Sequence, residues 1–127
     1  MYIIFGKEQA DSLGEKHTVL ELDTIKLMPS GTKVTAYAVV ESIAIPDMPM
    51  IETRRNLHDN LMVNYRERNW NFCDQAIEQL VGAWSGELDS FYSELQSRIN
   101  NYAENDPGEL WDPVIEKTVV NNPTPEL

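Results

Sequence analysis

One alternating stretch decides the fold, and it reads Thr18-Val19-Leu20-Glu21-Leu22-Asp23-Thr24-Ile25-Lys26-Leu27-Met28. Apolar and polar side chains alternate along it, which is the pattern of a half-buried β-strand. Leu20 and Leu22 share one face, but the apolar phase moves by one residue before Ile25. Because side chains alternate strictly along a strand, this slip predicts a bulge near Asp23 and Thr24.

The segments on either side of this strand extend the β region. Residues 29–32 contain a proline and a glycine in a turn pattern, and residues 33–42 alternate again, which predicts an antiparallel hairpin. Residues 1–5 are β-branched and aromatic and predict a short strand. Residues 7–13 are compatible with one or two helical turns that end at Gly14.

Beyond a two-proline connection at residues 45–50, the apolar period changes from 2 to 3.6. Three apolar stripes follow: one on residues 53–68, one on a segment capped by Asn69 or Asn71, and one after Ser85 and Gly86. They predict three helices, which we expect to pack antiparallel because the loops between them are short.

The predicted fold class is therefore α+β. A small N-terminal antiparallel β-sheet of about three strands is followed by three antiparallel α-helices. Residues 1–101 form a single domain, with a β-rich part at 1–45 and a helical part at 51–101. Residues 102–127 carry six acidic and one basic side chain, so they hold five of the eleven net negative charges. With few apolar residues to bury, this segment is predicted to be a flexible acidic tail.

The overall charge and apolar content argue against several classes of partner. The chain has 127 residues and a formal net charge of −11, and nucleic acids and anionic membranes are held mainly by basic groups. We therefore expect neither a nucleic acid nor a membrane as partner, and no apolar run is long enough to span a bilayer. The apolar start does not resemble a signal peptide, and Cys73 is the single cysteine, so we expect a cytoplasmic protein.

Partner binding is predicted at two places. Arg54, Arg55, Arg66 and Arg68 lie on the first long predicted helix. Arginine suits carboxylate and phosphate recognition. These side chains could hold an acidic partner segment, RNA or the acidic tail of this chain, or they could form ordinary surface ion pairs.

The second place is Leu110 with Trp111, within the predicted tail. An aromatic residue with acidic neighbours in a mobile segment is typical of a short docking motif. Random composition, or packing of Trp111 back onto the domain, is the alternative.

The residues that could carry chemistry have ordinary explanations, so we assign no catalytic residue, cofactor or metal site. Cys73 lies on an apolar stripe, which indicates an inert buried thiol. His17 and His58 lack the short spacing of metal ligands, and His58 is placed on a polar helix face. Glu21 and Asp23 share a strand face, where they could serve acid–base chemistry or a divalent cation, but a solvated sheet face is the simpler interpretation.

Two resemblances add to this reading. Residues 65–80, from Tyr65 through Asn69-Trp70 to Cys73, Ile77 and Leu80, resemble the turn and second helix of a tetratricopeptide-type hairpin, although no second copy follows at that repeat length. Residues 1–99 resemble conserved hypothetical proteins of contractile-tailed phages of marine cyanobacteria. The segments that carry this likeness are residues 3–8, 18–24, 68–73 and 86–92. The first resemblance implies a helical hairpin, and the second implies a phage origin without a mechanism.

These observations favour a non-enzymatic module that binds or modulates a host or viral protein. One alternative is an acidic decoy that mimics nucleic acid and occupies a nucleic-acid-binding protein. Another is an enzyme of unknown class. A homo-oligomer is also possible, because a small sheet has edges to cover.

Overall fold

The longest strand, β2 (Thr18–Met28), is the centre of the structure. The computed structural model describes residues 1–41 and 43–118 of the chain. β2 pairs antiparallel with β3 (Thr32–Val40), and the register shifts between Glu21 and Thr24. The bulge predicted from the apolar phase is thus confirmed. The hairpin turn passes through Gly31, whose φ of 77° suits a residue without a Cβ.

The sheet has one more strand than the sequence predicted. Its order is β1-β3-β2-β4, with β1 (Tyr2–Phe5) antiparallel to β3 and β4 (Val114–Thr118) parallel to β2. The expectation of a small antiparallel sheet of about three strands was therefore wrong in detail, although the α+β class is confirmed. β4 comes from the segment predicted as a flexible tail, and residues 119–127 of that segment lie outside the described residues.

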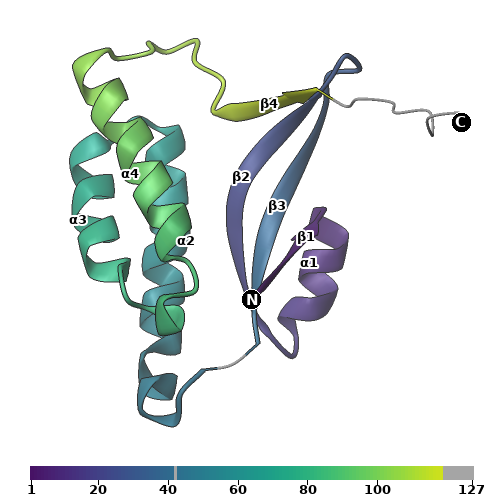
Figure 1. Ribbon diagram of the computed structural model, residues 1–127, viewed down its shortest axis with the longest axis vertical. Helices are drawn as coiled ribbons and strands as arrows, with labels where there is room; N and C mark the ends of the chain where they lie inside the picture. Colours follow the sequence, from purple (N-terminus) through teal and green to yellow (C-terminus); the bar gives the residue numbers. More distant parts are fainter. Residues whose placement is uncertain (42, 119–127) are drawn as a thin grey trace, which may run out of the picture.

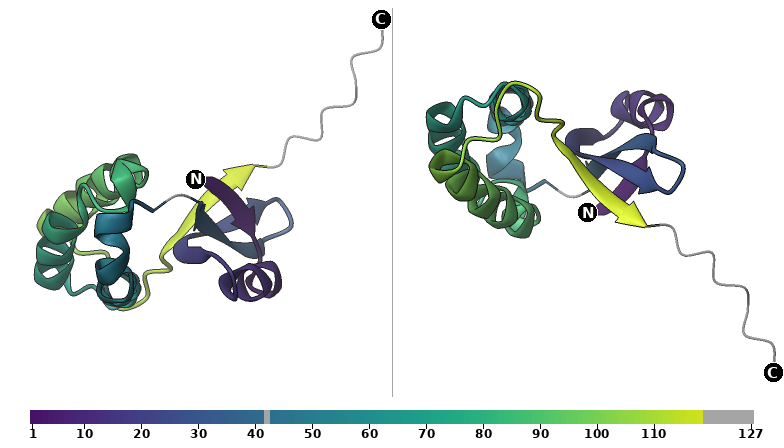
Figure 2. Two further views of the ribbon diagram at one scale, coloured as in Figure 1. Left: turned by 90° about the horizontal axis from the view of Figure 1, so that it is seen from below. Right: turned by 90° about the horizontal axis from the view of Figure 1, so that it is seen from above.

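Within the described residues, four α-helices cover the two faces of the sheet (Figures 1 and 2). The three predicted helices are α2 (Ile51–Arg66), α3 (Trp70–Leu80) and α4 (Asp89–Glu104), and they form a layer on one face. The fourth, α1 (Lys7–Gly14), lies on the opposite face. Two short 3-10 helices, η1 (Ile45–Met50) and η2 (Trp84–Gly86), precede α2 and α4. No helix in the described part of the chain has the length and apolarity needed to cross a membrane.

Each face of the sheet has its own core. The larger core joins Leu20 and Leu22 of β2 and the alanines of β3 to the apolar stripes of the three helices, including Leu61, Leu80 and Leu95. The smaller core joins Ile4, Ala10 and Val39 beneath α1. Residues on opposite faces thus alternate along β3, as a strand buried on both sides requires.

The segment after α4 is attached to the helical layer by aromatic packing. The ring centroid of Trp111 lies 5.3 Å from that of Tyr65, 5.7 Å from that of Trp70 and 4.9 Å from that of Tyr102. In addition, Arg68 donates a 2.9 Å hydrogen bond to Asp106. Trp111 therefore holds residues 105–113 against the domain and directs β4 to the edge of β2.

We predict that Trp111→Ala lowers the free energy of unfolding by about 2 kcal/mol, because it removes a half-buried aromatic side chain from this cluster. Leu110→Ala is the matched control, since Leu110 is 100% exposed, and we expect it to change stability by less than about 0.5 kcal/mol. Urea unfolding curves of the two variants measure the difference. Equal effects of the two substitutions would contradict the attachment of this segment by Trp111.

Candidate functional site

β2 has a lower half, residues 18–22, and an upper half, residues 24–28. The lower half has an open edge. β4 pairs with residues 24–28 of β2, and within the described residues no strand lies beside residues 18–22 on that side. The carbonyl oxygen of Glu21 points away from β3, toward α2, where it accepts a 2.6 Å hydrogen bond from His58 Nε2. Because backbone groups alternate in direction along an antiparallel strand, the N–H and C=O of Val19 point the same way. In the described part of the chain, no strand pairs with β2 at Val19 on that side, and no turn or loop backbone group is hydrogen-bonded to Val19.

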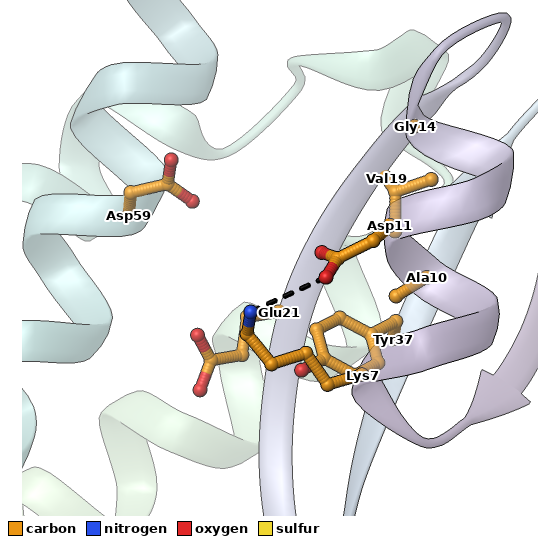
Figure 3. Close-up of a pocket in the computed structure, with 8 residues that line it drawn as sticks. All are labelled: Lys7, Ala10, Asp11, Gly14, Val19, Glu21, Tyr37 and Asp59. Atoms are coloured by element: carbon orange, nitrogen blue, oxygen red, sulfur yellow. Dashed lines mark hydrogen bonds and ion pairs between the residues drawn. The ribbon is translucent and has the colours of Figure 1, made fainter.

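This open edge forms the floor of a groove of about 380 Å³ between α1 and α2 (Figure 3). α1 supplies one wall through Lys7, Ala10, Asp11 and Gly14, and α2 supplies the other through Asp59. Val19, Glu21 and Tyr37 line the floor. Since α1 and α2 lie on opposite faces of the sheet, a groove lined by both must run along its edge. Sequence reasoning missed this site, because it depends on where β4 stops.

Carboxylates outnumber cations in the groove. Asp11, Glu21 and Asp59 line it, and Lys7, which lies 3.2 Å from Asp11 in an exposed ion pair, is the one basic side chain among its lining residues. Glu21 also forms an ion pair with Arg66, whereas Asp59 has no ion-pair partner within 4.0 Å among the described residues. Burial raises the pKa of Asp59, with Arg55 opposing this effect and Glu21 adding to it. The groove therefore favours a positively charged occupant.

His58, which is hydrogen-bonded to the carbonyl oxygen of Glu21, corrects one prediction. The sequence predicts that His58 lies on a polar helix face, but its side chain is fully buried. Its Nδ1 lies 2.9 Å from Tyr92 Oη, which in turn accepts a 3.0 Å hydrogen bond from Trp84 Nε1. With Nε2–H donating to Glu21, Nδ1 accepts the hydroxyl proton of Tyr92. The spacing of His58 from Leu61, Met62 and Tyr65 already matches the apolar stripe, and that signal could have shown its burial.

Glu21 and Asp23 correct a second prediction, because they do not form a solvated sheet face. The bulge turns Asp23 toward the helical layer, where Arg98 donates two hydrogen bonds of 2.9 and 2.8 Å to its carboxylate. Arg98 also donates to Tyr65 Oη at 3.3 Å. The two carboxylates thus hold α2 and α4 to β2, through Arg66 and Arg98 respectively.

The four arginines predicted to bind a partner each lie beside a carboxylate of the same chain. Arg54 lies 3.7 Å from Asp47 and Arg55 lies 3.4 Å from Glu52. Arg66 pairs with Glu21, and Arg68 pairs with Asp106 at 2.9 Å. These contacts match two of the alternatives that the sequence leaves open, ordinary ion pairs and contact with the chain's own acidic C-terminal segment. A role in partner binding stays a prediction, as it does for Leu110 and Trp111.

The remaining candidates are structural. Cys73 is buried, and burial raises the pKa of its thiol to about 12, so it remains protonated near neutral pH. In residues 1–41 and 43–118, no three His, Cys, Asp or Glu side chains lie close enough together to hold a metal ion. The groove is thus the site at which the geometry best indicates a ligand.

Comparison of the chain with protein-family models, curated proteins and solved structures gave no match.

We predict that His58 makes the protein less stable in acid. Burial lowers its pKa from 6.5 to about 4, so between these values the unfolded chain binds a proton that the folded chain excludes. The stabilisation is complete above about pH 6.5 and is lost as the pH falls toward 4. It amounts to about 3 kcal/mol in total.

The measurement is urea unfolding of the wild type and His58→Gln across this pH range. The variant is less stable at neutral pH, and we expect the gap in unfolding free energy to narrow by about 3 kcal/mol on acidification. Both proteins carry the same carboxylates, so subtracting their free energies of unfolding at each pH removes the contribution of those carboxylates. A gap that is independent of pH would contradict a buried neutral imidazole.

Proposed function

We propose that this protein is a non-enzymatic interaction module that binds an extended segment of a host or viral protein. The segment would lie in the groove and add as a strand to the open edge of β2. The observation that carries this proposal is the outward-facing, unpaired backbone of Val19 between two helical walls.

Strand addition suits this edge for a physical reason. Unpaired backbone donors and acceptors on a strand edge form hydrogen bonds readily with another extended chain. β4 already uses the upper half of the same edge in this way, over residues 24–28. A partner segment beside this edge would pair with the N–H and C=O of Val19, because the carbonyl of Glu21 is already bonded to His58.

The two alternative functions have less support from the contacts. A nucleic-acid mimic needs unpaired carboxylates along one face, whereas Glu21 and Asp23 are each engaged by an arginine. For an enzyme, the buried groups Cys73, His58 and Tyr92 would have to reach a substrate, yet all three are enclosed in the core. The groove, in contrast, is open to solvent and offers free backbone groups.

Gly14→Trp tests the proposal, because it fills the groove without straining the backbone. A Cβ at Gly14 meets nothing within 4 Å, and this glycine does not have a positive φ. We expect the variant to fold normally and to lose partner binding by at least about tenfold, since the bulky ring occupies the place of the incoming strand. Gln9→Trp, at an exposed position of the same helix that does not line the groove, is the matched control.

The measurement is affinity capture from cell lysate followed by titration of the captured protein against the three forms. The proposal predicts one protein that binds the wild type and Gln9→Trp and is lost from Gly14→Trp. A partner that binds Gly14→Trp as tightly as the wild type would place the interface elsewhere. Absence of any captured protein would remove support for an interaction module.

A further inference from the structure

We infer that the segment bound in the groove carries two consecutive basic residues. This inference rests on the proposed function, because it names the chemistry of the partner for the same groove. Its basis is the match between the charges on the two walls and the alternation of side chains along an added strand.

The charge of the groove argues for a basic occupant. Asp11, Glu21 and Asp59 line it against Lys7, and the chain as a whole carries a net charge of −11. A second copy of this chain, or an acidic protein, would bring like charges together. A basic segment instead gains from both the local and the overall field.

The carboxylates of Asp11, Glu21 and Asp59 differ in whether they already form an ion pair within the chain. Asp59 has no ion-pair partner within 4.0 Å among the described residues, and Figure 3 shows its carboxylate turned toward β2. Asp11 is paired with Lys7, but the two side chains are 67% and 81% exposed, so water weakens this pair and an incoming cation can replace Lys7. Glu21 already forms an ion pair with Arg66. An incoming cation would therefore bind most readily at Asp59 and next most readily at Asp11.

These two carboxylates lie on opposite walls, and this fixes the spacing of the cations. Asp59 belongs to α2 and Asp11 to α1, which cover opposite faces of the sheet. Successive side chains of a strand point to opposite faces. A strand added beside Val19 thus presents one residue to Asp59 and the next residue to Asp11. On the α1 side, the ring of Tyr37 offers a further surface for the cation.

Three labelled peptides of about six residues, the usual length of a strand, test this inference. All consist of alternating valine and threonine, with two residues replaced. The first carries Lys-Arg at adjacent central positions, the second carries Gln-Gln there, and the third carries the same two basic residues separated by one residue. Fluorescence anisotropy gives the dissociation constants, and amide chemical shifts show whether Val19 and Glu21 are contacted.

We expect the adjacent Lys-Arg peptide to bind most tightly and to shift the amides of Val19 and Glu21. Asp59→Asn should weaken its binding about twofold to fivefold and leave the Gln-Gln peptide unchanged. Glu78→Gln, which removes an exposed carboxylate on α3 away from the groove, should have no effect on either peptide.

The other outcomes separate this inference from the proposed function. If all three peptides bind equally and shift these amides, the groove accepts a strand but does not select charge, so the inference fails and the proposed function stands. If the spaced peptide binds as tightly as the adjacent one, the assignment of one cation to each wall is wrong. If no peptide shifts these amides, the inference fails. If the protein is a dimer in solution and Gly14→Trp makes it monomeric, the occupant is a second copy, and a basic partner is ruled out.

Discussion

The structure depends on the hydrogen bond between the imidazole of His58 and the carbonyl oxygen of Glu21. This carbonyl lies at the bulge, where the pairing of β2 with β4 stops, so it has no partner in the sheet. Leaving it buried and unpaired would cost about 1–3 kcal/mol. His58 supplies the missing donor from α2. Its second ring nitrogen accepts from Tyr92 on α4, and Tyr92 accepts from Trp84 in η2. One neutral imidazole thus ties two helices to the irregular point of the sheet.

This connection explains why the groove exists. The bulge divides β2 into an upper half that pairs with β4 and a lower half that does not. His58 satisfies the carbonyl of Glu21 from the helical layer, so α2 lies on its face of the sheet close to the lower edge of β2. The Arg98–Asp23 ion pair, formed from the same bulge, holds α4 in the adjoining position. The helical layer is therefore fixed close to the open edge, and α1 completes the opposite wall.

Periodicity predicted much of this fold, because it depends on local sequence. The alternation of β2 and β3, the phase slip at Asp23 and the three helical stripes all follow from which residues must be buried. β4 could not be predicted in this way, since its pairing uses backbone groups and its position is set by the distant packing of Trp111 on Tyr65. The burial of His58, in contrast, could have been predicted from periodicity. Its neighbour Asp59 is polar, but its own position three residues before Leu61 matches the buried stripe.

The candidate site was harder to predict than the fold. Its walls come from α1 and α2, its floor comes from β2, and its length is set by the end of β4, so no single segment of sequence contains it. Arginine often binds partners, but in the structure each of the four arginines predicted to do so pairs with a carboxylate of the same chain. The informative feature was instead an absence of pairing in the backbone, which only the three-dimensional arrangement reveals.

Amide hydrogen exchange of the isolated protein tests most directly whether the lower edge of β2 is open. Leu20 pairs with Ala38 through backbone groups directed at β3, whereas the N–H of Val19 points into the groove. We predict that the Val19 amide exchanges much faster than the Leu20 amide, although the two residues are adjacent in one strand. Equal and strong protection of both amides would contradict it, because the edge would then already be covered in the free protein.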